Sequence, residues 1–177
     1  MGDPVLSVVV VSHRMRREIP RTLRSLAPRC QRGIAAGDYE IVLVDNGSPS
    51  PPRAEDHRDL GMDLRCLVNP EPSCSPVAAI NLGMREARGG IVGVFIDGAR
   101  MASPGLLAAA VEAVGSGPRA VVGARGRYLG PGFQSETMLC GYGQDAEDRL
   151  LDRVAWPEDG YRLFAESVFD ESSGPTW

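Results

Sequence analysis

The sequence contains no lysine, so all 19 of its fixed basic side chains are arginines. A P-loop needs a Gly-Lys-Ser/Thr segment, and this class of phosphate site is therefore excluded. A G-x-S-x-G segment is also absent. The turn Ser12-His13-Arg14-Met15-Arg16, which follows the first apolar run, has no glycine. This argues against a dinucleotide fold and a class I methyltransferase, which bring the backbone close to their ligand at that turn.

Cysteine is scarce and scattered. Cys30, Cys66, Cys74 and Cys140 form no C-x-x-C pair and have no histidine nearby. Structural zinc and a disulfide framework are both disfavoured in a chain of this length, and we expect free thiols. No apolar run approaches the roughly 20 residues of a membrane helix. The segment Met1-Gly2-Asp3-Pro4 lacks the basic and apolar regions of a secretory signal, and we expect a cytoplasmic location.

The 177 residues are about one domain's length, and 43% apolar and 24% charged residues fit a globular protein. A net charge of −4 argues against a dedicated nucleic-acid binder. Seven arginines nevertheless fall between Arg14 and Arg32. They predict either contact with phosphates or an anionic membrane surface, or the solvated face of a helix. The helical spacing of Ile19, Leu23 and Leu26 favours the helix face.

Apolar runs and helix signals alternate along the first 126 residues. Helices are expected after Pro20, after Ser75-Pro76 with Val77, Ile80, Met84 and Ala87 inward, and after Ser103-Pro104. Strands are expected at 5–11, 41–44, 64–68, 91–96 and 120–124, and short helices at 54–60 and 150–154. The alternation predicts an α/β fold: an open, mostly parallel twisted sheet with helices on both faces. After Gly126 we expect an irregular region.

Two of the expected strands end at an aspartate followed by a tight-turn sequence. These aspartates are Asp45, in Asp45-Asn46-Gly47-Ser48, and Asp97, in Asp97-Gly98-Ala99. The carboxyl ends of parallel strands face the ligand crevice, where two carboxylates can bind a base, a ribose or a metal-bound diphosphate. The first tetrapeptide is also an ordinary turn sequence, and Asp97-Gly98 is also typical of a hairpin. The helix cap at Ser103-Pro104 favours a crossover over the hairpin.

These segments together resemble the inverting glycosyltransferases of family 2, which have the GT-A fold. The resemblance covers roughly residues 7–124. It lies in Ser7–His13 (a strand ending like P-T-Y-N), Ile19–Leu26 (like L…T-L-x-S-L), Glu40–Ser48 (like E-I-I-V-V-D-D/N-G-S) and Ala78–Gly90 (like A-A-R-N-x-G…A-x-G). Each piece is a weak signal, and their order and spacing make the resemblance fairly specific.

The resemblance implies a nucleoside diphosphate sugar as donor and assigns residues to its parts. Ser12 and His13 would line the nucleobase pocket, and Asp45 would accept a hydrogen bond from the base N–H. Asp97 would lie by the ribose and diphosphate. Glycine at 47 and 98 allows the backbone to turn sharply under the ligand. The remaining candidate contacts are Asn46, Asn81, whose alternative role is to tether its own helix, and Arg100.

The sequence departs from the family pattern at the metal motif. The family usually carries Asp-x-Asp, whereas this chain has Asp97-Gly98-Ala99, and Gly98 and Ala99 offer no side-chain ligand to Mg²⁺ or Mn²⁺. Either Asp97 binds the cation with a ligand from elsewhere, or the diphosphate charge is met without metal. Arg100 is the nearest candidate for the second route, since a guanidinium binds phosphate oxygens bidentately.

An inverting transfer also needs a carboxylate base for the acceptor hydroxyl. Asp145, Glu147, Asp148, Glu158 and Asp159 are available, and the sequence singles out none of them. We expect residues 1–126 to bind the donor and residues 127–177 to form a partial acceptor-side region. The chain is then mainly the donor-binding half of such an enzyme, with an unidentified acceptor. The alternatives are a catalytically inactive binding or scaffold domain of this fold and, more weakly, a sugar-phosphate nucleotidyltransferase.

Overall fold

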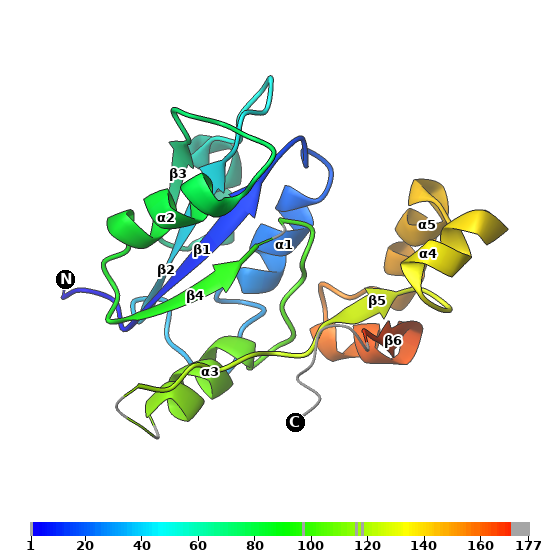
Figure 1. Cartoon of the computed structure of the whole chain (residues 1–177). Helices are drawn as coiled ribbons and strands as arrows, with labels where there is room; N and C mark the ends of the chain where they lie inside the picture. The colour runs from blue at the N-terminus through cyan, green and yellow to red at the C-terminus, as the bar shows by residue number, and fades with distance from the viewer. Residues whose placement is uncertain (1, 97, 116, 118, 171–177) are drawn as a thin grey trace.

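The computed structural model describes residues 2–96, 98–115, 117 and 119–170, and its centre is a four-stranded parallel sheet. The strands are β1 (Leu6–Ser12), β2 (Tyr39–Asp45), β3 (Leu64–Val68) and β4 (Ile91–Phe95), in the order β3-β2-β1-β4 (Figure 1). β1 and β2 are buried along their whole length, as their β-branched residues predict for strands covered on both faces. Their register pairs Ser12 with Asp45 at the carboxyl ends.

Helices cover both faces of this sheet. α1 (Ile19–Leu26), α3 (Leu106–Gly115) and the 3₁₀ helix η1 (Ala54–Leu60) pack on the face that carries Val8, Val10 and Leu43. α2 (Val77–Glu86) lies on the other face, against Val9 and Val44. The predicted α/β fold with helices on both faces of an open parallel sheet is therefore confirmed.

The inward face predicted for α2 is right at Ile80 and wrong at Val77 and Met84. Ile80 packs against the cluster that contains Val9 and Val44. Val77 and Met84 are 56% and 48% exposed, whereas Ala79 and Gly83 are buried. A Cβ on Gly83 would lie 2.4 Å from Cγ1 of Val9, so the helix approaches the strands too closely there for a larger side chain.

The strand predicted at 120–124 is also wrong. These residues have no regular secondary structure, and Val121 is 99% exposed. A strand needs a hydrogen-bonding neighbour, and within the described part of the chain no strand pairs with this segment. Its β-branched composition alone is not enough to form a strand.

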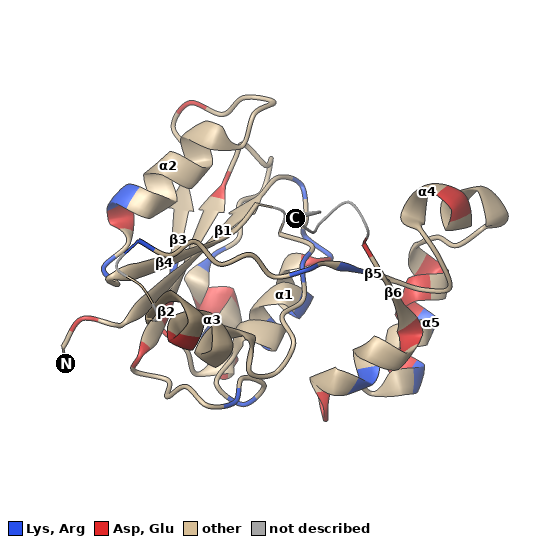
Figure 2. Ribbon diagram, turned by 60° about the horizontal axis from the view of Figure 1, so that its bottom comes forward, with Lys and Arg blue, Asp and Glu red and all other residues tan. Residues whose placement is uncertain are grey.

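The region after Gly126 contains more regular structure than expected and lies to one side of the sheet (Figures 1 and 2). Its elements are β5 (Arg127–Leu129), α4 (Gln134–Thr137), η2 (Met138–Cys140), α5 (Gln144–Val154), η3 (Gly160–Glu166) and β6 (Ser167–Phe169). β5 and β6 pair antiparallel. The short helix predicted at 150–154 is confirmed and begins earlier, at Gln144.

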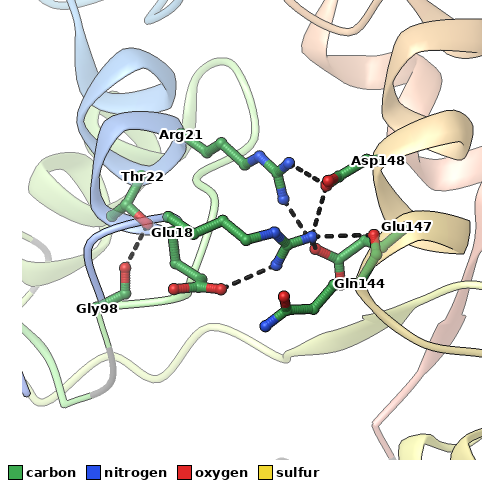
Figure 3. Close-up of polar contacts among 8 residues, drawn as sticks. Glu18, Arg21, Thr22, Gly98, Gln144, Glu147 and Asp148 are labelled. Atoms are coloured by element: carbon green, nitrogen blue, oxygen red, sulfur yellow. Dashed lines mark hydrogen bonds and ion pairs between the residues drawn. The ribbon is translucent and has the colours of Figure 1, made fainter. Parts of the chain in front are cut away.

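Two arginines, one just before α1 and one in its first turn, pair with carboxylates of α5. Arg17 Nη2 lies 2.6 Å from Oδ1 of Asp148 and 3.0 Å from Oε1 of Glu147. Arg21 Nη1 lies 2.9 Å from the same Glu147 oxygen, and its Nη2 also pairs with Asp148 (Figure 3). We call these four residues the α1–α5 ion cluster. Part of the arginine-rich stretch thus pairs with carboxylates of this chain.

The four cysteines are free thiols, and Cys74 and Cys140 are exposed. None of the helices in the described ranges is long and apolar enough to cross a membrane.

Candidate functional site

A hollow of about 180 Å³ lies at the carboxyl ends of the central strands. It is bounded by the end of β1 and the turn after it, by the residue after β2, by the loop that precedes α2, and by the residue after β4. The lining residues are Val11, Ser12, His13, Met15, Asn46, Ser73, Cys74, Pro76 and Ile96. Ser12, His13 and Asn46 thus lie where the sequence predicts a nucleoside, at the edge that parallel sheets use for ligands.

The carboxylate of Asp45 is turned into its own turn. The side chain is 1% exposed, and Oδ2 accepts hydrogen bonds from the backbone N–H of Gly47 (3.1 Å) and of Ser48 (2.7 Å). Oδ1 accepts from the Ser48 hydroxyl at 2.5 Å and from the Ser12 hydroxyl at 3.4 Å. Asp45 therefore shapes the turn beside the hollow and is not among the residues that line it.

Asn46 lines the hollow, but its side-chain amide holds the loop between β3 and α2. Its Nδ2 donates to the carbonyls of Ser73 (2.9 Å) and Ser75 (3.4 Å). Its Oδ1 accepts from Nδ2 of Asn69 at 2.8 Å, and Asn69 also donates to the carbonyl of Glu71 at 3.1 Å. Both asparagines are buried. They fix the loop that forms one wall of the hollow.

The turns after β1 and β2 are bonded to each other. Nδ1–H of His13 donates to the carbonyl of Asn46 at 2.9 Å, and the N–H of Arg14 donates to the Ser48 hydroxyl at 2.8 Å. Arg14 adopts a positive φ of 56°, which is uncommon for a residue with a Cβ. Gly47 has φ 91°, and a Cβ there would lie 2.6 Å from Cβ of Pro72. The sequence therefore needs glycine at 47 for both its conformation and its contact with the loop.

The other predicted site residues lie apart from this wall. Asn81 is exposed on α2, and Arg100 is exposed in the loop after β4; neither lines the hollow. Asp97 lies outside the described residues. Gly98 is buried against α1, where Thr22 Oγ1 donates to its carbonyl at 2.6 Å. The predicted meeting of the Asp45 and Asp97 carboxylates stays a prediction.

The residues that the structure describes do not make a divalent cation site. Among them, no group of three His, Cys, Asp or Glu side chains converges. Gly98 and Ala99 bring no side-chain ligand, and hard cations bind several oxygens. The donor set in this part of the chain therefore does not fit Mg²⁺ or Mn²⁺.

Most of the candidate bases of the C-terminal region are engaged with arginines. Glu147 and Asp148 belong to the α1–α5 ion cluster, and hydrogen bonds from Arg21 and Arg17 lower the pKa of Asp148. Glu158 pairs with an arginine at 3.0 Å. Asp159 caps η3 and lies 3.5 Å from an arginine. The lowered pKa makes Asp148 a weaker base than a free carboxylate.

Glu40 lies at the opposite end of β2 from the hollow, and its side chain is fully buried. Burial opposes its ionisation, but hydrogen bonds from Ser7 and Arg88 and the charge of Arg65 outweigh burial and lower its pKa to about 2. The Ser7 hydroxyl lies 2.6 Å from Oε1, and Arg65 Nη2 lies 3.0 Å from Oε2. This acidic residue of the family-like segment stabilises the fold, far from the hollow.

A larger hollow, of about 540 Å³, lies between α5 and the β5–β6 pair and is lined partly by Tyr142, Arg149, Arg153 and Glu166. No strand end of the parallel sheet reaches it. We place the candidate site in the smaller hollow because three predicted residues from separate segments converge there.

The sequence analysis did not predict several of the residues that line the hollow. Ser73, Cys74 and Pro76 line the hollow, and Asn69 anchors their loop. Asn69 directly follows β3, as Asp45 ends β2, so a polar residue at the end of a third parallel strand was an available signal. Met15 and Ile96 had no such signal.

Solved structures of other proteins are similar to this chain in fold. TarS from S. aureus has a TM-score of 0.54 and 23% identity, over 63% of this chain and 19% of TarS. TarS 1–349 in complex with UDP-GlcNAc has a TM-score of 0.54 and 23% identity, over 63% of this chain and 31% of that one. The mannosyltransferase PcManGT from Pyrobaculum calidifontis, in complex with GDP-Man and Mn²⁺, has a TM-score of 0.52 and 22% identity, over 69% of this chain and 34% of that one. No curated protein sequence matches the chain.

These structures share the fold, and the aligned part covers about one fifth to one third of each of them. The family described as Glycosyl transferase family 2 matches residues 7–171, which is nearly the whole chain. The chain therefore belongs to glycosyl transferase family 2.

Proposed function

We propose that this chain binds a nucleoside diphosphate sugar and supplies the donor half of an inverting sugar transfer to an unidentified acceptor. The observation that carries the proposal is the hollow in which Ser12, His13 and Asn46 meet at the carboxyl ends of β1 and β2. Solved structures of the same fold were obtained with UDP, UDP-GlcNAc and GDP-Man. In this proposal residues 1–126 bind the donor and residues 127–177 form part of the acceptor side.

The nucleoside enters the hollow in this proposal, and the diphosphate lies toward the loop after β4. For Asp45 to accept the N–H of the base, the base has to replace the Ser48 hydroxyl on Oδ1, because the carboxylate itself does not line the hollow. Asp97 and Arg100 face the diphosphate, and Asn81 remains a candidate for a further contact. A cation, Mg²⁺ or Mn²⁺, would need Asp97 together with the phosphate oxygens, since the described residues supply no cluster. Cytoplasmic location and contact with an anionic membrane surface remain predictions.

Binding is tested by the melting temperature of the chain with UDP, GDP and dTDP and with their sugar conjugates, each with and without Mn²⁺. Ligand at 100 times Kd adds about 2.7 kcal/mol to the free energy of unfolding. We expect one base to raise the melting temperature and Asp45→Asn to remove most of the rise. Asp59→Asn, on the exposed part of η1, is the matched control and should keep it. No rise with any nucleotide contradicts the proposal.

The engaged carboxylates of the C-terminal region favour a second candidate, binding without turnover. Glu147, Asp148, Glu158 and Asp159 all contact arginines, and within the described part of the chain none of them lines the hollow. Release of UDP or GDP from the bound sugar donor separates the two candidates. Release that is lost in Asp97→Ala supports the enzyme, and tight binding with no release supports the binding domain.

A further inference from the structure

The loop between β4 and α3 is bonded to side chains of α1. Thr22 is fully buried, and its Oγ1 donates to the carbonyl of Gly98 at 2.6 Å (Figure 3). One turn further along α1, the Ser25 hydroxyl accepts the N–H of Ala102 at 2.8 Å and donates to the carbonyl of Thr22 at 2.6 Å. The two hydroxyls thus hold the described loop residues 98–102 at both ends.

Gln31 extends this attachment to the start of α3. Its Nε2 donates to the carbonyls of Ser25 (2.8 Å) and Ser103 (3.1 Å), and its Oε1 accepts the N–H of Leu107 at 3.4 Å. The loop backbone therefore takes its position from α1 and the segment after it.

At Gly98 the loop packs closely against α1 and against the end of β1. A Cβ there would lie 2.7 Å from Cδ1 of Ile19, 3.0 Å from the carbonyl oxygen of Val11 and 3.2 Å from Sδ of Met15. Gly98 is a buried residue, and the Thr22 hydroxyl supplies the hydrogen bond that its carbonyl would otherwise make to water. A buried carbonyl without a donor is costly, so loss of this hydroxyl would drive the loop to another position.

We propose that Thr22 is a positioning residue that fixes the loop 98–102 for the diphosphate of the donor, an inference that rests on the proposed function. Thr22 is buried and touches no part of the hollow, so it acts through the Gly98 backbone. The nucleoside walls formed by Ser12, His13 and Asn46 have no hydrogen bond to Thr22 in the described part of the chain. The hydroxyl therefore sets the added affinity that the diphosphate contributes, and leaves affinity for the nucleoside unchanged.

The test compares Thr22→Val with Thr22→Ser by isothermal titration. Valine keeps the shape and loses the donor, whereas serine keeps the donor and loses a methyl group. Each variant is titrated with UDP and uridine and with GDP and guanosine. We expect Thr22→Val to weaken diphosphate binding about tenfold, the size of one lost hydrogen bond to a buried partner, with nucleoside binding unchanged. Thr22→Ser should keep the wild-type ratio of nucleoside to diphosphate affinity.

Two results overturn the inference: unchanged affinity of Thr22→Val for both the nucleoside and the diphosphate, or an equal loss of affinity for both, which would show a general structural effect. A second measurement, amide hydrogen exchange without ligand, decides the case in which the wild type binds no nucleotide. Faster exchange at 98–102 in Thr22→Val and Ser25→Ala, with β1 and β2 unchanged, is expected. Unchanged exchange at this loop would refute the positioning role, whereas absent nucleotide binding alone would refute the proposed function.

Discussion

Replacing Glu40 by glutamine should destabilise the fold strongly without touching the candidate site. Glu40 is fully buried, and its two oxygens accept hydrogen bonds from Ser7 Oγ (2.6 Å), the Arg88 N–H (2.8 Å), Arg88 Nε (2.9 Å) and Arg65 Nη2 (3.0 Å). Glutamine removes the negative charge and leaves two guanidinium groups without their buried counter-ion. Breaking a fully buried pair from one side costs about 3–5 kcal/mol. The cost here should lie at the lower end of that range, because Arg65 and Arg88 are 30% and 43% exposed and keep Glu86 and Asp63 as partners.

The pKa of Glu40 gives a second measure of the same contribution. A fall from the ordinary 4.5 to about 2 corresponds to about 3 kcal/mol between the folded and unfolded chains. The folded carboxyl has the lower pKa, so this stabilisation is complete above the ordinary value. It is lost progressively as pH falls from about 4.5 to about 2.

Urea unfolding followed by circular dichroism measures both the loss of stability in Glu40→Gln and its dependence on pH. We expect Glu40→Gln to be about 3 kcal/mol less stable than the wild type at pH 7, with the difference shrinking below pH 4.5. Asp63→Asn is the matched control, because Asp63 pairs with the same Arg88 at the surface. An exposed pair is worth less than about 1 kcal/mol. Equal effects of the two variants, or a Glu40 effect that does not change with pH, would refute the reasoning.

Three further predictions concern α2, the loop before it and the contact with α5. Gly83→Ala forces a methyl group against the sheet and should lower the free energy of unfolding in urea by about 1–3 kcal/mol. Gly90→Ala is the control, because a methyl group there enters open space. Similar losses of stability in the two variants would contradict the close packing of α2. Asn46→Ala should release the loop between β3 and α2 and speed its cleavage in limited proteolysis; an unchanged cleavage rate would show that other contacts hold the loop. Changing Arg17 and Arg21 together to glutamine should speed the cleavage of α5 by a protease, because their ion pairs with α5 are lost. Salt at 1 M should have the same effect on the wild type, because it screens these charges. If α5 resists cleavage in both cases, apolar contacts alone hold it.

The strands of the sheet were predictable because their composition favours strands and each of them has a neighbouring strand to pair with. The β3 prediction matches residue for residue, and the cap and proline signals located α2 and α3. The segment 120–124 has the same β-branched composition but no neighbouring strand, which a local pattern does not reveal. Ile80 was placed correctly on the inward face of α2, whereas Val77 and Met84 were not, because close packing selected Ala79 and Gly83 and hydrophobicity does not report how near two elements lie.

The site was predictable in position and less so in the role of each side chain. Parallel strands deliver their ends to one edge, so Ser12 and Asp45 were found there from sequence alone. A turn aspartate and a ligand aspartate look alike in sequence, and only the hydrogen bonds from Gly47 and Ser48 show how Asp45 is engaged. Asn46 likewise bonds to residues 27 and 29 positions away, a separation that no local motif encodes.

The position of Glu40 shows that the two ends of β2 have different roles, one in stabilising the fold and the other in forming the candidate site. Asp45, the last residue of β2, lies five residues further along the strand, about 17 Å away. A substitution among the turns after β1 and β2 leaves the buried carboxylate and its arginines intact. The amino-terminal end of β2 therefore stabilises the sheet independently of the turns that form the candidate site.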